Sequence, residues 1–410
     1  MSAWLAARTA DAKMPRATRL IMTDKIASIP SLAPLQRVML EDSLFAPGAG
    51  HHVEQLEIGL FRDLTSERVL AAWTDTVART EALRIAFLTI NGRALGWERV
   101  TPRNLLDLVQ PKPLSWESWL AADRCLPLLV PHKVPWRAAY WHGARRFIWT
   151  FHHALLDGRS IARIVRGFRE RLIGGKAEDL ALSGWRDPSP KQIGRAEIMF
   201  REMMVKPESA EFDFPPENDG RAVRCLGRAI AMSLDSLAAG LAVTPGTVLT
   251  WAWGQALAQT TGTGAVLLEQ LRAGAPQPGT AGFTMNTLPV SVRLAAASET
   301  AASLQDLQAR LLARREIEAV SPADFPPGVH PNMDGPGSST IMIERATLQH
   351  LAGGQGIESL VLHEAKGESL MATGYLLPDL RLEVEGPGRH CLLEAWIAVL
   401  ERLGRDVYPA

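Results

Sequence analysis

The chain has 410 residues, of which 47% are apolar and 21% charged, a composition typical of folded globular proteins that excludes wholesale disorder. Its 44 Lys and Arg residues balance 44 Asp and Glu residues, so no net charge favours binding to nucleic acid or an anionic membrane. No apolar stretch reaches the roughly 20 residues that span a bilayer, and residues 1–19 lack the apolar core of a signal peptide, so we expect a cytoplasmic protein.

The cysteines lie far apart in the chain, at Cys125, Cys225 and Cys391. An odd, scattered set makes a poor disulfide framework and lacks the close pairs of a zinc site. We therefore expect three small buried side chains and no bound metal.

The first part of the chain predicts an extension and then alternating helices and strands. Residues 1–30 are weakly patterned and are expected to form an N-terminal extension. Apolar residues from Leu35 to Leu44 recur at helical spacing, and a turn at Ala46–Gly50 ends this helix. From Val53 to Phe61 apolar residues alternate with polar ones, which is the period of a strand buried on one face. Another helix is expected after Thr65.

The clearest strand and helix follow. Aromatic residues alternate from Arg146 to His153, and from Ser160 to Leu172 apolar residues fall on one helical face. Arginines occupy the other face of this helix, at Arg163, Arg166 and Arg169.

The rest of the chain predicts a second lobe. The segment 183–220 is rich in proline and charge, and we expect it to connect a lobe at 31–182 to a lobe at 221–410. Helices are predicted near Val248–Thr260 and Leu392–Leu403. Strands and helices alternate irregularly and without repeats, which predicts a mixed α/β or α+β architecture.

One motif points to chemistry, and it reads His152-His153-Ala154-Leu155-Leu156-Asp157-Gly158. An H-H-x-x-x-D-G pattern arises by chance in such a chain roughly once in a thousand. Consecutive residues on a strand point to opposite faces, so the two histidines cannot serve one site. One is expected to be buried and hydrogen-bonded on the side of Thr150, while the other faces a cavity.

Each residue type in the motif suits a role. A histidine with an ordinary pKa of about 6.5 is mostly neutral at pH 7, so its ring can accept a proton from an attacking amine or hydroxyl. Asp157 suits an ion pair with an arginine that fixes the loop, and Gly158 permits a close approach or a backbone angle closed to other residues. A purely structural role for the histidines is the alternative.

Other chemistries lack their motifs. The sequence contains no G-x-S-x-G for a serine nucleophile and no G-x-x-x-x-G-K-[ST] for a P-loop. Two adjacent strand histidines also cannot chelate one metal ion.

The motif resembles the H-H-x-x-x-D-G signature of condensation domains of nonribosomal peptide synthetases, in the chloramphenicol acetyltransferase-like superfamily. Three other stretches resemble motifs of this family in the same order. Leu32–Leu40 is similar to the first condensation motif, Arg79–Phe87 to R-H-E-x-L-R-T-x-F, and Gly282–Val290 to G-x-x-x-N-T-L-P. Their collinear order over most of the chain is more specific than any single match.

The resemblance implies two acetyltransferase-like lobes with mixed sheets flanked by helices, arranged as a V-shaped pseudo-dimer around a tunnel. An acyl group on the phosphopantetheine arm of an acyl or peptidyl carrier protein would enter from one side. A small-molecule or carrier-bound amine or hydroxyl acceptor would enter from the other side. His153 would position or deprotonate the acceptor, and an amide or ester would form in natural-product biosynthesis. No bound cofactor is implied.

The resemblance also assigns the remaining site residues. The catalytic motif comprises His153 with His152, Asp157 and Gly158 as the residues that hold its loop. Asn286 and Ser160 are assigned to the substrate channel. The family aspartate pairs with an arginine, and the candidates are Arg293 and Arg84.

Some positions depart from the family pattern. Thr80 stands where the R-H-E motif has histidine, and Arg159 follows D-G where an aromatic residue is common. The D-F-G-W-G motif of the plant acyltransferases is absent. With no adenylation or carrier signature, we expect a free-standing, monomeric enzyme.

Two other functions remain as alternatives. One is an acyltransferase of the same fold that uses acyl-CoA, with the arginines at 163, 166 and 169 near the nucleotide; a solvated helix face is the simpler interpretation of that cluster. The other is a non-catalytic recruiting or docking domain, which is expected to lose part of the motif that is intact here. An epimerase shares the motif and is excluded less firmly.

Overall fold

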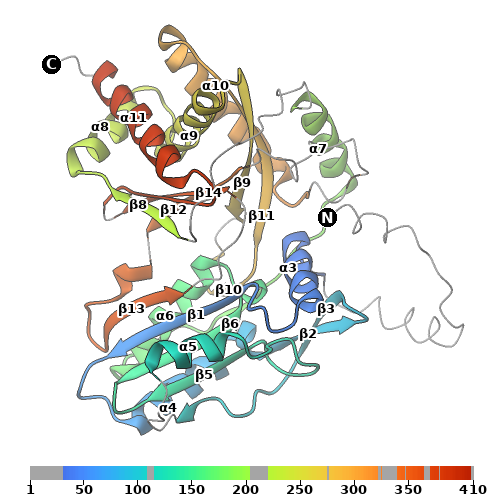
Figure 1. Ribbon diagram of the computed structural model, residues 1–410. Coiled ribbons are helices and arrows are strands. Elements are labelled where there is room, and N and C mark those ends of the chain that lie inside the picture. Colours follow the sequence, from blue (N-terminus) through green and yellow to red (C-terminus); the bar gives the residue numbers. More distant parts are fainter. Residues whose placement is uncertain are drawn as a thin grey trace, which may run out of the picture.

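The computed structural model describes residues 31–108, 115–203, 220–274, 277–321, 325, 339–346, 348–363, 370–377 and 379–407. These residues form two lobes, each with a β-sheet and covering helices (Figure 1). The predicted mixed α/β architecture in two lobes is confirmed.

The first lobe is built on a five-stranded sheet with the order β13-β1-β6-β5-β4, in which all neighbours are antiparallel except β4 and β5. The strands are β1 (Val53–Leu60), β4 (Asp107–Leu108), β5 (Trp136–Trp141), β6 (Arg146–His152) and β13 (Ile357–His363). The helices are α3 (Pro34–Phe45), α4 (Ser66–Ala78), α5 (Trp116–Arg124), α6 (Gly158–Leu172) and the 3-10 turns η2 (Glu81–Arg84), η3 (His153–Leu155) and η7 (Leu348–Leu351). A hairpin of β2 (Ile85–Ile90) and β3 (Arg93–Arg99) lies beside α3.

An aromatic cluster fixes α4 and α6 on one face of this sheet. Trp73 of α4 is buried, with its ring centroid 5.0 Å from that of Phe147, 5.4 Å from that of Trp149 and 5.5 Å from that of Phe168 on α6. Such edge-to-face contacts are favourable beyond the area they bury. The alternating aromatics of β6 therefore orient the helix that carries the end of the H-H-x-x-x-D-G motif.

The prediction that β1 is buried on one face is wrong, because all eight of its residues are buried. β1 lies between β13 and β6, and α5 covers the face opposite α4 and α6. Polar residues on that face share one acceptor: Gln55 donates to Asp123 Oδ2 at 2.8 Å, and Thr150 donates to the same oxygen at 2.6 Å. A charged or polar residue in β1 is thus a buried group, not a solvent-facing one.

The second lobe has a six-stranded mixed sheet with the order β11-β9-β12-β14-β15-β8. The strands are β8 (Arg221–Cys225), β9 (Ala265–Ala273), β11 (Met285–Arg293), β12 (Ser339–Ala346), β14 (Leu370–Leu377) and β15 (Arg381–Glu385). The helices are α8 (Arg228–Gly240), α9 (Pro245–Thr261), α10 (Thr300–Ala313), α11 (Arg389–Val407) and the 3-10 turns η4 (Ala297–Glu299) and η5 (Arg314–Ile317). Helix α9 is buried all round, and its Trp253 packs edge to face on Trp396 of α11 at 5.2 Å.

Two segments of the second half of the chain lie in the first lobe. β13 adds to the edge of β1, and the short β10 (Thr280–Gly282) pairs in parallel with β7 (Ala181–Ser183). Figure 1 shows β13 lying beside β1, away from the strands that flank it in sequence. The range 221–410 therefore supplies one lobe and also two strands of the other.

The segment 183–220, expected to be a simple connection, contains a helix in its described part. α7 (Pro190–Met203) packs its buried Phe200 edge to face on Phe325 at 5.5 Å, in a small apolar cluster with residues of β11 and η5. The predicted extension at 1–30 lies outside the described residues. The expectation of buried cysteines is wrong, since all three are exposed.

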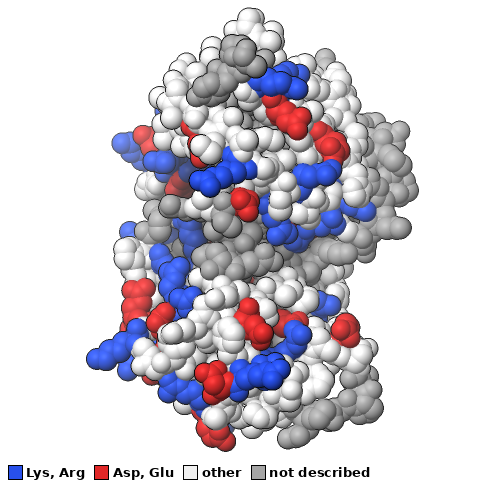
Figure 2. Space-filling model, turned by 90° about the vertical axis from the view of Figure 1, so that its left-hand side faces the viewer, with Lys and Arg blue, Asp and Glu red and all other residues white. Residues whose placement is uncertain are grey.

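Charged side chains of both signs are interspersed on the face in Figure 2, and neither sign forms a continuous field. Within the described residues, no single helix has the length and apolar composition to cross a bilayer, and the one pair that passes by composition, α8 with α9, is bent by 104°.

The first testable prediction concerns Gly282, where β10 approaches β7 most closely. A Cβ on this residue would collide with the carbonyl oxygen of Ser183. We expect Gly282→Ala to lower the free energy of unfolding by about 1–3 kcal/mol, the usual cost of overpacking. Gly264→Ala is the control, because a Cβ there meets no atom within 4 Å. Equal melting temperatures for the two variants would contradict the close approach.

Candidate active site

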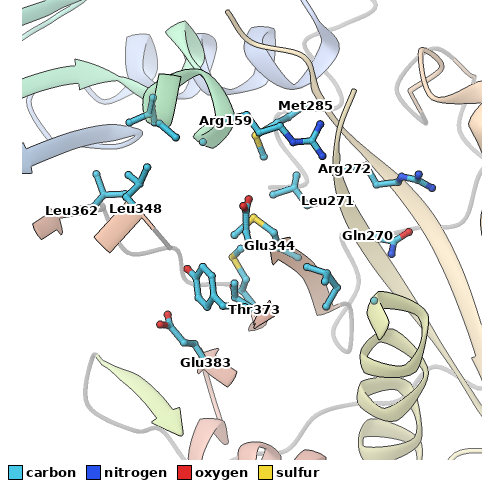
Figure 3. A pocket seen from close by; sticks show the side chains of 18 of the residues that line it. Arg159, Gln270, Leu271, Arg272, Met285, Glu344, Leu348, Leu362, Thr373 and Glu383 are labelled. Carbon is cyan, nitrogen blue, oxygen red and sulfur yellow. The ribbon is translucent and has the colours of Figure 1, made fainter. Parts of the chain in front are cut away.

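A cavity with a volume of about 1190 Å³ lies between the two lobes. From the first lobe it is lined by β1, β13, the start of α6 and the residue after β6. From the second lobe it is lined by β9, β12, β14, β15 and α10. In Figure 3, Arg159 and Met285 approach from one side and Thr373 and Glu383 from the other, with Glu344 between them.

His152 lies in the interior, not in this cavity. Its side chain leaves the same sheet face as Thr150 and is 1% exposed. The backbone N–H of Ala154 donates to Nδ1 at 3.1 Å, so the ring proton resides on Nε2, which donates to Ser43 Oγ at 2.9 Å. Burial holds the pKa of His152 at about 3, well below the ordinary 6.5. A neutral, fixed ring of this kind stiffens the loop and takes no part in proton transfer at neutral pH.

His153 faces the cavity from the other side of the chain. Its side chain is 23% exposed, and its ring packs edge to face on Phe283 at 6.0 Å. The Nδ1 atom lies 2.9 Å from Oε1 of Glu54, a buried β1 residue that also lines the cavity. The two histidines therefore serve different environments, as the alternation predicts.

The loop that carries His153 is tied down by the first condensation-like motif. Gln36 of α3 is buried, and its Nε2 donates to the carbonyl of Ala154 at 2.8 Å. Its Oε1 accepts from the N–H of Ala33 at 2.8 Å, so both ends of the amide are used. The loop is thus fixed from α3 on one side and by the His152 ring on the other.

Asp157 caps α6 and reaches across to the second-lobe sequence. Its Oδ1 accepts from the backbone N–H of Ser160 at 2.9 Å, the usual N-cap contact. Its Oδ2 accepts from Thr284 Oγ1 at 2.9 Å and from Thr284 N–H at 3.3 Å. The carboxylate is therefore satisfied by a helix terminus and a threonine.

The predicted ion pair between Asp157 and an arginine is wrong for the described residues. Arg84 lies at the end of η2, and its backbone carbonyl accepts from Val100. Arg293 is exposed at the far end of β11, and its backbone carbonyl accepts from Gln255 Nε2 at 2.6 Å. A carboxylate that receives three hydrogen bonds needs no counterion.

The two residues assigned to the substrate channel lie outside it. Ser160 is buried beneath β10, where its Oγ accepts from Gly282 N–H at 3.0 Å. Asn286 is also buried, and its Nδ2 donates to the carbonyls of Glu318 and Val320, each at 2.9 Å. The alternation of β11 explains this, because Met285 lines the cavity and the next residue points away. Gly158 does line the cavity.

Two arginines of α6 hold the segment before β10 in place. Arg159 Nη1 donates to the carbonyl of Gly274 at 2.7 Å, and Arg163 Nη1 donates to the carbonyls of Gln277 and Thr280 at 2.7 and 2.6 Å. Arg166 is exposed, in agreement with a solvated helix face. Of the predicted basic cluster, Arg163 therefore has a structural role.

The cavity wall of the second lobe combines an apolar stretch with charged and polar side chains. Its apolar side chains include Leu271, Met285, Met342, Ile343 and Met371. Charged groups lie farther along the wall, among them Arg272, which pairs with Glu318 at 2.8 Å. Among the described residues, no group of three or more His, Cys, Asp or Glu side chains is arranged to hold a metal ion.

Sequence reasoning missed Glu54, Gln36 and Thr284. Glu54 carried a signal, because it occupies the same face of β1 as Leu56 and Ile58, where a charged residue is unexpected. Gln36 lies within the motif at Leu32–Leu40, but its partner, the carbonyl of Ala154, is 118 residues away. No local pattern in the sequence predicts contacts of that kind.

Comparisons with known proteins agree with the sequence motifs. Nonribosomal peptide synthetase 5 of Aspergillus fumigatus is 25% identical over 341 residues, which are 70% of this chain and 14% of that protein. One of the linear gramicidin synthase proteins of Brevibacillus parabrevis is 26% identical over 348 residues, 72% of this chain and 6% of that protein. The chain thus spans a small part of the length of these relatives. No family model matches it.

Solved structures show the same fold. The first condensation domain of the CDA synthetase superposes with a TM-score of 0.68 at 17% identity, covering 92% of this chain and 96% of that one. The predicted resemblance to condensation domains of nonribosomal peptide synthetases is therefore confirmed in sequence and in fold.

The second prediction follows from the low pKa of His152. The unfolded chain binds a proton at this residue below about pH 6.5, whereas the folded protein binds it only near pH 3. Folding stability should therefore fall with decreasing pH across this window, by up to about 1.4 kcal/mol per pH unit from this group. His152→Gln, which cannot titrate, should show a slope shallower by about one proton in pH-dependent denaturation. Parallel slopes would contradict the buried neutral ring.

The third prediction concerns the contact between Asp157 and Thr284. Asp157→Ala removes a helix cap and strands the two donors of Thr284, so the free energy of unfolding should fall by about 1–3 kcal/mol. Thr284→Val removes only the hydroxyl donor and should cost less. In a double-mutant cycle measured by denaturation, the double variant should lose less stability than the sum of the single variants. Additive losses would show that the two side chains do not interact.

Proposed function

We propose that the protein is a condensation enzyme that joins a carrier-tethered acyl thioester to an amine or hydroxyl acceptor. The observation that carries the proposal is the position of His153, on an intact H-H-x-x-x-D-G loop and at the wall of a cavity lined by both lobes. Related segments in nonribosomal peptide synthetases support a role in natural-product biosynthesis. In this role the phosphopantetheine arm of the donor carrier protein is part of the substrate.

The geometry supports a direct transfer. The acceptor nitrogen or oxygen attacks the thioester carbonyl carbon, and its proton passes to His153, whose ring is exposed to the cavity. The new C–N or C–O bond forms as the C–S bond breaks. The proton then moves from the imidazolium to the departing phosphopantetheine thiolate, which returns the histidine to its neutral form. Holding both reactants in one cavity supplies the proximity that such a transfer needs.

One stretch of the second-lobe wall suits an apolar acyl chain. Leu271, Met285, Met342, Ile343 and Met371 line it, and flexible methionines fit chains of varied shape. Charged residues such as Arg272 and Glu383 line the same cavity, so a donor or acceptor with polar groups also finds partners there.

The alternative with an acyl-CoA donor has less support. It needs cations for the nucleotide, and Arg159 and Arg163 already donate to backbone carbonyls that anchor the segment before β10. A docking domain without activity is also less well supported, because the motif is intact and the imidazole lines a large cavity. A monomeric and cytoplasmic enzyme remains our prediction.

The fourth prediction tests the proposed reaction. Purified protein is given one acyl group on carrier proteins or on CoA, together with a panel of amines and alcohols, and products are measured by mass. We expect turnover with a carrier donor, higher kcat/KM than with the matching acyl-CoA, and a roughly 10²–10⁴-fold loss in His153→Ala.

His142→Ala is the control for this test, since His142 is not among the cavity-lining residues. It should retain wild-type turnover. Wild-type rates in His153→Ala would overturn the assignment of the base, and faster reaction with acyl-CoA would favour the alternative donor.

A further inference from the structure

Two buried glutamates on β1 have different surroundings. Glu57 lies on the α5 side of the sheet, where Trp116 Nε1 and His363 Nε2 each lie 3.2 Å from its Oε2, and its other oxygen pairs with Arg146. Glu54 lies on the opposite side of the sheet, on the face it shares with Phe151. Its side chain is 6% exposed, and the ion pair that it makes among the described residues is with His153.

The register of the sheet creates this second contact. Glu54 lies directly opposite Phe151, and the N–H of His153 donates to the carbonyl of His52 at 2.7 Å, which continues the pairing beyond the strand end. Glu54 and His153 are therefore diagonal neighbours on one face, within reach of long side chains. The contact follows from backbone pairing and does not depend on a flexible loop.

The charge environment gives the contact a chemical consequence. A buried carboxylate on an apolar strand face is costly unless a cation or a hydrogen-bond donor compensates it. Oε2 of Glu54 has no hydrogen-bond partner among the described residues, so compensation depends on the imidazole beside Oε1. The Nδ1 atom of that imidazole is shielded from solvent and lies at ion-pair distance from Oε1, although the two atoms are not aligned for a hydrogen bond. The exposed part of the ring therefore lies on the cavity side, away from Nδ1.

We propose that Glu54 is the positioning residue of His153. The carboxylate holds the ring proton on Nδ1, which leaves the lone pair of Nε2 directed at the cavity. It also stabilises the imidazolium formed when Nε2 takes the proton of the acceptor, without accepting that proton itself. The stabilisation of the imidazolium rests on the proposed function, whereas the control of the tautomer does not.

The test therefore begins with a measurement that needs no activity. In protein labelled with ¹⁵N-histidine, ring nitrogen shifts at neutral pH report which nitrogen carries the proton, and the His153 signals are those absent from His153→Ala. We expect the Nδ1–H tautomer in the wild type and a shift toward Nε2–H in Glu54→Leu, whose side chain suits the apolar face. An Nε2–H ring in the wild type, or the same tautomer in both proteins, would overturn the proposal.

Glu57→Gln is the matched control, with a buried glutamate changed on the same strand but on the other face. It should lose stability because it weakens the contacts of Arg146 and Trp116, while the tautomer of His153 stays unchanged. A tautomer shift of equal size in Glu57→Gln would mean that distortion of the strand, and not the Glu54 carboxylate, determines the tautomer of His153.

Rates then test the catalytic consequence. Glu54→Gln, which keeps shape and removes charge, should lower kcat at least about tenfold with little change in KM, and by no more than the roughly 10²–10⁴-fold expected for loss of the base. Adding His153→Ala to Glu54→Gln should cause little loss beyond that of His153→Ala alone, because the two residues act as a unit. Additive losses, or wild-type kcat in Glu54→Gln, would contradict the positioning role.

If the expected tautomers are found but the wild type shows no turnover with any donor, the proposed function fails while the pairing of Glu54 with His153 stands.

Discussion

The hydrogen bonds at the N-terminus of α6 hold residues 282–284 against the H-H-x-x-x-D-G loop. Asp157 receives the N–H groups of Ser160 and Thr284, and its own N–H donates to the carbonyl of Gly282 at 3.0 Å. Gly282 in turn donates to Ser160 Oγ. The segment that leads into β11 is therefore joined to the loop that follows His153. Because these donors and acceptors are buried and satisfy one another, displacing one of them leaves others unpaired.

This arrangement separates two tasks within one short motif. His152 and Asp157 are buried and hydrogen-bonded in the interior, away from the cavity, so they fix the backbone of the loop. His153 lies between them in sequence but projects into the cavity, where its ring is accessible to a substrate. The alternation of a strand at its end provides both environments within two residues. The adjacent histidines are therefore explained by geometry, since one ring stabilises the loop on which the other is carried.

The local parts of this picture were predictable, and the long-range parts were not. Hydrophobic periodicity predicts the strand at 146–152 and the helix that follows it, because alternation and helical spacing are properties of neighbouring residues. The burial of β1 on its second face depends on α5, whose Asp123 lies 68 residues from its partner Gln55 in sequence. The expected arginine partner of Asp157 came from the chemistry of a buried carboxylate and from the family resemblance, and it was wrong because Thr284 and the helix terminus already satisfy this carboxylate. Glu54 was predictable in part. Its charge is unexpected on an apolar strand face, so the sequence singles it out, but its partner His153 follows only from the register between β1 and β6.

Two departures from the family pattern, at Arg159 and Thr80, have structural explanations. Arg159 replaces an aromatic residue after D-G, and its guanidinium anchors the carbonyl of Gly274, so it forms part of the cavity wall and also fastens the segment before β10. Thr80 replaces a histidine, and it is buried at a bridge to Leu180, more than 70 residues before the H-H-x-x-x-D-G loop in sequence. Both residues hold neighbouring segments of the first lobe in place. Arg159 thereby shapes the cavity that His153 also lines, whereas Thr80 acts on the first lobe alone.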